Sequence, residues 1–380
     1  MKTDLPIGIL GDGQLALMLG EAAESQGIDF LGFGADPDSS FAVRYPNRFT
    51  QGSLTDRTAL NEFARRCSVL TLENEFIPEP LLRSVVADAG VPIVPDPDSY
   101  RYFQDKISQR IFFEEHDIPG PKWLKLENSR PPFTFPFVVK AAQGGYDGYG
   151  VRIVANETEF QEALLQFRFA EGREILIEEK VAIVREFAQG VLLDGRGNVV
   201  FLPLVETIQR NGTCELALSR STLPSDEVSK IANLVKSSLQ KLAKTRLQGL
   251  FNFEFFYTQS GSVLINEGAP RPHNSQHLTI DASSISQFGL LMKYLAEGKL
   301  QTREIEAAPS VMINLLGKSK GSVYSLTLPA IPEGIQVFPK LYLKKECRPG
   351  RKMGHLNLVD PSGKNDLLEI GEKILKEYQL

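Results

Sequence analysis

The chain has 380 residues, which at about 150 residues per domain predicts two or three domains. Its 42 basic and 47 acidic side chains give a net charge of −5, whereas a general nucleic-acid binder carries a basic excess. No apolar run approaches the ~20 residues that cross a bilayer, so we expect no membrane association. The three cysteines, Cys67, Cys214 and Cys347, are odd in number and far apart, which favours a reducing cytoplasm over a disulfide framework.

Short apolar runs alternate with amphipathic stretches over the first hundred residues. Strands are expected at residues 7–10, 30–33, 68–72 and 91–94, and helices from residue 14 to about 26 and over 80–89. This alternation is typical of a parallel sheet with helices on both faces. We therefore predict a Rossmann-like N-terminal domain over residues 1–98.

A glycine-containing turn joins the first expected strand to the first expected helix. Gly11 and Gly13 would let backbone N–H groups approach an anion at the N-terminus of that helix. Asp36 lies about where an acidic side chain would bind the ribose of a dinucleotide. Two interpretations stay open: a dinucleotide site, or a tight turn unrelated to dinucleotides.

Strands dominate after residue 120. A helix is expected after an N-cap near Ser99, before the strands begin. The expected strands are residues 137–140, 151–154, 174–181, 186–193 and 199–208, and the expected helices are 157–167, 225–244 and 285–296. A hairpin is expected at 250–257 and 263–267, and the last ~70 residues are rich in strands. We place a central domain at 99–305 and a small β-rich C-terminal domain at 306–380.

Lys140 ends an expected strand and is followed by four glycines within seven residues. Such a loop between two strands can fold over a polyphosphate, with backbone N–H groups as donors and the lysine as a charge. It is not a P-loop, because the lysine of a P-loop follows the glycines and opens a helix. A flexible hairpin without a ligand is the alternative.

The expected hairpin carries one acidic residue on each strand, close to each other. Glu254 lies opposite Asn266 or Glu267, with the register uncertain by one residue. Carboxylates that close repel each other unless a cation or a proton lies between them, and oxygen ligands favour Mg²⁺. The alternative is a salt bridge to Arg271.

Two further segments are rich in polar groups. His273 and His277 are four residues apart, but Pro270 and Pro272 argue against the helix that a zinc pair would need. A polar substrate suits this loop better. The basic run at 344–355 would suit a phosphate, or it forms a solvated basic face.

Taken in order, these segments resemble the ATP-grasp superfamily and, within it, the carboxylating synthetases of purine biosynthesis. The resemblance spans essentially the whole chain and rests on residues 8–15, 73–75, 104–106, 144–150, 266–275 and 348–355. It implies a Rossmann-like N-terminal domain, a central ATP-grasp domain with a lid at about 120–182, and the small C-terminal domain. It also implies a homodimer.

The resemblance further implies a set of site residues. ATP would contact Lys106, Lys140, Gly145, Tyr146, Asp147, Gly148, Gly150, Glu178, Glu179, Val181, Glu186, Gln209, Asn266 and Glu267. Mg²⁺ would bind Glu254 and Glu267. The acceptor, aminoimidazole ribonucleotide, would contact Gly13, Gln14, Glu75, Arg271, His273 and Asn274, and its phosphate would contact Lys345, Arg351 and Lys352.

The implied reaction joins bicarbonate to the exocyclic amine of the ribonucleotide at the expense of ATP. Bicarbonate attacks the γ-phosphorus, and the carboxyphosphate formed, or CO₂ released from it, is captured by the amine. The lid would exclude bulk water from this labile intermediate. Glu75, Tyr146 and Arg271 are the catalytic candidates, with Tyr146 and Glu75 assigned to proton transfer and to orienting the amine.

The sequence departs from the superfamily pattern at several positions. Tyr149 replaces a basic residue, a change worth about 1.5–3 kcal/mol if a contact to an anion is lost. The other departures are Leu17, Thr207, Gln209, Gln276 and Leu278. These changes keep open a ligase acting on a different acceptor, and the glycine turn keeps open an NAD(P)-dependent oxidoreductase.

Overall fold

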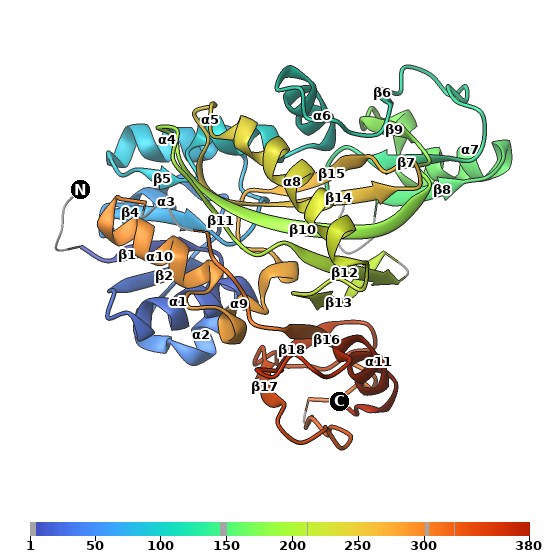
Figure 1. The fold of residues 1–380 in the computed structure, drawn as a ribbon. Helices are drawn as coiled ribbons and strands as arrows, with labels where there is room; N and C mark the ends of the chain where they lie inside the picture. The colour runs from blue at the N-terminus through green and yellow to red at the C-terminus, as the bar shows by residue number, and fades with distance from the viewer. Residues whose placement is uncertain (1–4, 145–149, 211, 301–303, 323) are drawn as a thin grey trace.

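The computed structural model describes residues 5–144, 150–210, 212–300, 304–322 and 324–380. Three units follow one another along the chain, coloured blue, green to orange, and red in Figure 1. This confirms the predicted architecture of a Rossmann-like domain, a central ATP-grasp domain and a small C-terminal domain. In the described part of the chain, no helix combines the length and the apolar character needed to span a membrane.

The N-terminal unit is a five-stranded parallel sheet with the order β3-β2-β1-β4-β5. Its strands are β1 (Ile7–Leu10), β2 (Phe30–Gly34), β3 (Phe49–Gln51), β4 (Val69–Leu72) and β5 (Ile93–Val94). Its helices are α1 (Gln14–Ser25), α2 (Ser40–Arg44), η1 (Pro46–Arg48), α3 (Arg57–Ala64) and α4 (Glu79–Ala89). Side chains of β1 pack on α1 on one face and on α3 and α4 on the other, which explains why the whole strand is apolar.

The helix expected after Ser99 is interrupted. The structure has α5 (Pro97–Tyr100), η2 (Arg101–Phe103) and α6 (Lys106–Glu115) in its place. The break occurs because the side chain of Asp105 accepts a hydrogen bond from the Ser108 N–H and starts a new helix. This break places Lys106 at the first turn of α6.

A four-stranded antiparallel sheet, with the order β6-β9-β7-β8, lies within the predicted lid range. Its strands are β6 (Trp123–Lys125), β7 (Phe137–Ala141), β8 (Val151–Val154) and β9 (Ile175–Glu179). The helices α7 (Glu157–Gln166) and η3 (Phe169–Glu171) connect β8 to β9. An arrangement like a capping box starts α7, since Asn156 accepts from the Glu159 N–H and Glu159 accepts from the N–H of Ala155, the residue before the N-cap.

The largest sheet has nine strands, with the order β15-β14-β10-β12-β13-β16-β18-β17 and β11 paired to β10. Its strands from the central unit are β10 (Ile183–Asp194), β11 (Val199–Phe201), β12 (Val205–Arg210), β13 (Thr213–Leu218), β14 (Gln248–Thr258) and β15 (Val263–Ala269). The helices of this part of the chain are α8 (Ser225–Leu242), η4 (Asn274–Gln276), α9 (Thr279–Ala282) and α10 (Gln287–Glu297). The prediction of one strand over 199–208 is wrong. The chain breaks near Pro203, which cannot donate to a ladder, and β11 and β12 pair with different parts of β10.

The C-terminal unit continues the same sheet, because β16 (Ser310–Leu316) pairs with β13. It also contains β17 (Gln336–Leu341), β18 (Lys352–Val359) and α11 (Leu367–Glu377), and this last helix was not predicted. Asp366 caps α11, and Leu367 and Ile374 bury its apolar face. The segment between β17 and β18 lies beside the N-terminal unit, because Ser40 Oγ donates to the Tyr342 carbonyl at 2.5 Å and Lys345 lies 2.5 Å from Asp38.

Candidate active site

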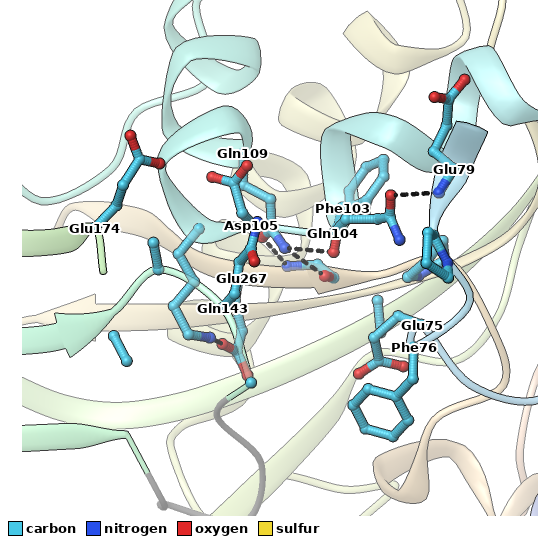
Figure 2. Close-up of a pocket in the computed structure, with 18 of the residues that line it drawn as sticks. Glu75, Phe76, Glu79, Phe103, Gln104, Asp105, Gln109, Gln143, Glu174 and Glu267 are labelled. Atoms are coloured by element: carbon cyan, nitrogen blue, oxygen red, sulfur yellow. Dashed lines mark hydrogen bonds and ion pairs between the residues drawn. The ribbon is translucent and has the colours of Figure 1, made fainter. Parts of the chain in front are cut away.

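Two adjoining cavities lie between the units, one lined by the N-terminal and central units and the other by all three. The first, of about 700 Å³, contains Lys106 and the end of β7, and we call it the Lys106 cavity. The second, of about 1170 Å³, contains Gly13, Gln14 and Lys352, and we call it the Lys352 cavity. The residues that line both cavities are Glu75, Phe76, Glu267, Arg271 and His273. Figure 2 shows the Lys106 cavity, with Glu267 and Glu75 pointing into it from different elements.

The hairpin of β14 and β15 pairs Glu254 with Glu267 directly, followed by a bulge, so the open register is settled. Asn266 Nδ2 donates to Glu254 Oε2 at 3.2 Å. Burial and the neighbouring Glu267 raise the pKa of Glu254, while Lys106 holds the pKa of Glu267 low. The site therefore holds two close carboxylates that repel each other. The alternative of a salt bridge from this hairpin to Arg271 is wrong, because Arg271 pairs with Glu75.

Lys106 and Lys140 both lie beside this hairpin. Lys106 forms an ion pair with Glu267, and Lys140 Nζ lies 2.7 Å from Glu178 Oε2 and donates to Asn266 Oδ1 at 3.1 Å. Glu178 is almost fully buried. Lys106 and Glu267 line the Lys106 cavity, whereas Lys140, Glu254 and Asn266 lie beside that pair without lining the cavity themselves.

Arg110 is a member of this cluster that the sequence analysis missed. Its Nε donates to Glu178 Oε1 at 2.5 Å, and its guanidinium also donates to the carbonyl oxygens of Ile265 and Asn266 at 2.8 and 2.7 Å. A signal for it existed, since Arg110 follows Lys106 by four residues and thus shares its helix face.

The glycine loop after β7 is described only at its ends. Gly144 lines the Lys106 cavity, and the Gly150 carbonyl accepts from the Ala141 N–H at 2.8 Å. The predicted contacts Gly145, Tyr146, Asp147 and Gly148 lie outside the described residues, as does Tyr149.

The remaining predicted ATP contacts lie along β9, β10 and β12, away from both cavity linings. Glu179 Oε1 accepts from the Lys122 N–H at 3.1 Å, and Val181 is half-buried between β9 and β10. Glu186 pairs with Thr207, which puts Gln209 on the same face two residues along β12. Burial raises the pKa of Glu186 to about 7.

The turn after β1 already holds an anion from the protein itself. The Glu73 carboxylate accepts from the N–H groups of Gly13 and Ala16, each at 3.0 Å, at the N-terminus of α1. A Cβ on Gly11 would lie 1.9 Å from the Glu73 side chain, so glycine is required by this close approach. A pyrophosphate would need the amides that Glu73 occupies, and the dinucleotide interpretation is therefore wrong.

Glu75 and Arg271 form a two-point ion pair at the junction of the cavities, with Arg271 Nη2 2.9 Å from Glu75 Oε1. Arg271 holds the pKa of Glu75 low, so Glu75 is a carboxylate. Burial, together with Arg271, lowers the pKa of His273 to about 4, so His273 is neutral near pH 7. The Asn274 amide exchanges hydrogen bonds with Asn314, a partner on β16 that the sequence analysis missed.

The basic run lines the Lys352 cavity, through Lys344, Lys345, Arg348, Arg351 and Lys352. It lines the same cavity as Gly13 and Gln14, while Lys345, Arg348 and Arg351 are also exposed to solvent, so both interpretations of the run stay open. Lys345 remains exposed and lies 2.5 Å from Asp38. Two segments about 330 residues apart thus border the same space.

Comparisons with known proteins cover most of the chain. Residues 1–104 match the ribonucleotide synthetase preATP-grasp domain, 112–288 the ATP-grasp domain, and 310–369 the phosphoribosylaminoimidazole carboxylase C-terminal domain. The N5-carboxyaminoimidazole ribonucleotide synthase of Mycobacterium tuberculosis is 34% identical over 93% of this chain and 83% of its own length. The chain belongs to the N5-carboxyaminoimidazole ribonucleotide synthase family.

Solved structures of this family share the fold. The synthetase of Thermotoga maritima is 30% identical, with a TM-score of 0.83 over 99% of each chain. The synthase of Aspergillus clavatus, solved in complex with ATP, is 26% identical, with a TM-score of 0.82 over 98% of this chain and 100% of its own.

Three of the residues that depart from the superfamily pattern are buried in the core. Leu17 and Leu278 are fully buried among apolar side chains. Gln276 is buried, and its Nε2 donates to the Pro203 carbonyl at 2.9 Å. None of the three lines either cavity, so these side chains contribute to packing.

Proposed function

We propose that this chain carboxylates 5-aminoimidazole ribonucleotide, using ATP and bicarbonate, to give N5-carboxyaminoimidazole ribonucleotide, ADP and phosphate in de novo purine biosynthesis. One observation carries the proposal. A single segment, residues 267–273, borders both a cavity with a lysine beside paired carboxylates and a cavity with a basic rim. The first suits a nucleotide triphosphate, and the second suits a phosphorylated acceptor.

We assign the nucleotide side to Lys106 and Lys140, which would neutralise phosphate oxygens, with Gly145, Tyr146, Asp147, Gly148 and Gly150 covering them. Glu178, Glu179, Val181, Glu186, Gln209 and Asn266 complete the proposed ATP contacts.

Glu254 and Glu267 fit a magnesium ion, because two partly exposed carboxylates pair directly across the hairpin and repel each other. The described residues contain no group of three or more His, Cys, Asp or Glu that could hold a metal, so the remaining ligands would be phosphate oxygens and water. When bound, Mg²⁺ supplies charge neutralisation at the phosphates.

The chemistry divides into two transfers. A bicarbonate oxygen attacks the γ-phosphorus, the bond to the β-phosphate oxygen breaks, and ADP leaves with that electron pair. The exocyclic amine then attacks the carboxyl carbon of carboxyphosphate, or of CO₂ released from it; phosphate leaves and the amine loses a proton. Glu75, fixed by Arg271, would orient the amine, and Tyr146 would assist proton transfer.

The acceptor would lie in the Lys352 cavity. We assign its phosphate to Lys345, Arg351 and Lys352, and its ring and ribose to Gly13, Gln14, His273 and Asn274. Neutral His273 can form hydrogen bonds here without adding charge beside Arg271.

A ligase with another acceptor is the second candidate, and Tyr149 and Gln209 are the residues that favour it. Leu17, Gln276 and Leu278 do not support it, since they are buried away from both cavities. The two candidates separate in one assay. ADP release from MgATP and bicarbonate should depend on aminoimidazole ribonucleotide; an active preparation that ignores it but responds to another amine would reject the first candidate.

We further propose domain boundaries at 98/99 and 305/306, a lid at about 120–182, a homodimer, and a cytoplasmic location. All three cysteines are free and buried, which suits a reducing compartment. Light scattering coupled to gel filtration tests the dimer, and limited proteolysis with mass spectrometry tests the boundaries.

A further inference from the structure

The segment that carries the polar groups of the site begins in the nine-stranded sheet and leaves it part-way along the segment. Residues 265–273 begin in β15, which is the edge strand of the nine-stranded sheet, and continue beyond its last residue, Ala269. Within the described residues, no strand pairs with their outer edge, where the Ile265 N–H donates to the Pro119 carbonyl at 2.7 Å and the later residues depend on side chains. Buried backbone groups need partners, so side chains must supply them.

Gln109 of α6 supplies two of these hydrogen bonds to one residue. Its Oε1 accepts from the Gly268 N–H at 2.9 Å, and its Nε2 donates to the Gly268 carbonyl at 3.1 Å. Figure 2 shows this side chain beside Glu267, the residue that precedes Gly268. Gln109 is buried, so water cannot easily replace it.

Gln287, at the start of α10, likewise forms hydrogen bonds with both backbone groups of one residue, at the C-terminal end of the segment. Its Oε1 accepts from the His273 N–H at 2.9 Å, and its Nε2 donates to the His273 carbonyl at 2.8 Å. Asn252 reinforces this end by donating to the Arg271 carbonyl at 2.8 Å. Gln287 is fully buried, and its own N–H is held by Thr279 Oγ1 at 3.0 Å.

The orientation of Gln287 is fixed by a third partner. Its Nε2 also lies 3.1 Å from Nδ1 of His277. An amide nitrogen only donates, so Nδ1 accepts and the proton of neutral His277 lies on Nε2. The three contacts leave the amide one orientation, which makes it a rigid clamp on His273.

We propose that the two glutamines are positioning residues of the reaction, Gln109 for the nucleotide side through Glu267 and Gln287 for the acceptor side through Arg271 and His273. This inference rests on the proposed function. Displacement of a reacting or binding group by about 1 Å can cost on the order of a hundredfold in rate, so each clamp should affect the half of the reaction that it holds.

The test is a matched pair of substitutions, Gln109→Met and Gln287→Met, which keep the side-chain length and remove every hydrogen bond. For Q287M we expect the KM for the ribonucleotide to rise by about tenfold or more, with the KM for ATP within about twofold of wild type. More ADP should also be released per carboxylated product. For Q109M we expect the reverse pattern, a raised KM for MgATP with an unchanged KM for the ribonucleotide. Gln161→Met, on exposed α7, is the control for the substitution itself.

A purely structural role would lower the melting temperature and the maximal rate of both variants and leave both KM values unchanged, which overturns the proposal. Equal changes of both KM values in each variant overturn it as well. If either methionine variant does not fold, Gln109→Asn and Gln287→Asn are used, which keep the amide on a shorter side chain. Each of them must then raise the KM of one substrate and leave the KM of the other unchanged, as predicted for the methionine variant. A wild-type enzyme without ribonucleotide-dependent ADP release refutes the proposed function, whereas an active wild type with unaffected variants refutes only this inference.

Discussion

The two sides of the site hold their charges in opposite ways. On the nucleotide side, Arg110 and Lys140 are almost fully buried and both form ion pairs with the buried carboxylate of Glu178. Lys106 pairs with Glu267. On the acceptor side, Lys345 and Arg351 are exposed at the rim of a larger cavity. A substrate arriving on the first side must replace the ion pair of Lys106 with Glu267, whereas one arriving on the second displaces only water and the exposed pair of Lys345 with Asp38. The nucleotide side should therefore be sensitive to single substitutions, and the acceptor side tolerant of them.

The largest effect is expected from Arg110→Met. It leaves Glu178 with a single cationic partner and removes the donors to the carbonyls of Ile265 and Asn266. Losing one member of a buried ion cluster costs about 3–5 kcal/mol, so the urea midpoint of unfolding should fall sharply. Arg57→Met, in an exposed pair with Asp88, should change the midpoint little. Equal midpoints for the two variants would contradict the comparison.

Glu267→Gln should have the next largest effect. It removes one carboxylate of the proposed magnesium pair and the partner of Lys106. We expect kcat to fall about a hundred- to a thousandfold, because the phosphates lose their charge neutralisation. Initial-rate measurements at saturating substrates, across a Mg²⁺ titration, check this. Glu304→Gln, at an exposed site, is the control, and a Glu267→Gln enzyme with normal magnesium dependence would rule out the metal assignment.

A pH effect is expected away from both sides, at His355. Burial lowers the pKa of His355 to about 3, and the groups facing it are Tyr342, His277 and Lys340. A folded-state pKa below the unfolded value means that the stabilisation is full above about pH 6.5 and is lost as the pH falls towards 3. Between about pH 7.5 and pH 5, one such group accounts for about 2 kcal/mol of the free energy of unfolding.

His355→Gln should therefore show a loss of stability on acidification that is smaller than wild type by about that amount. Denaturant unfolding at the two pH values measures it. An identical pH dependence in the variant and the wild type would mean that His355 is not neutral in the folded state.

The smallest effect is expected at the open rim. Arg351→Gln should raise the KM for the ribonucleotide about fivefold with little change in kcat, since an exposed cation is worth about 1 kcal/mol to a phosphate. The difference from wild type should shrink in about 1 M salt, because screening is then nearly complete. Lys364→Gln, exposed and outside the cavity, is the matched control. A loss that does not depend on salt would place Arg351 in a desolvated contact instead.

Much of the fold could be predicted because the evidence for it is local. The apolar run at β1, the capping box at Asn156 and the turn at Gly261 each specify their own few residues. The two wrong element predictions also have local causes. Asp105 starts a new helix, and Pro203 interrupts the ladder of hydrogen bonds between strands. The continuation of the central sheet into β16 was not predictable, because strand pairing across about 95 residues leaves no mark in either strand.

The sequence by itself determined which residue types are available: paired acids on a hairpin, a lysine at a strand end, and a basic run near the C-terminus. Only the tertiary structure decided what each one contacts. Glu73 rather than a ligand occupies the amides of Gly13 and Ala16, Glu75 rather than Glu267 pairs with Arg271, and Gln287 reaches His273. The reason is physical: a buried polar group must find a partner, and packing, not spacing along the chain, determines which one is within reach.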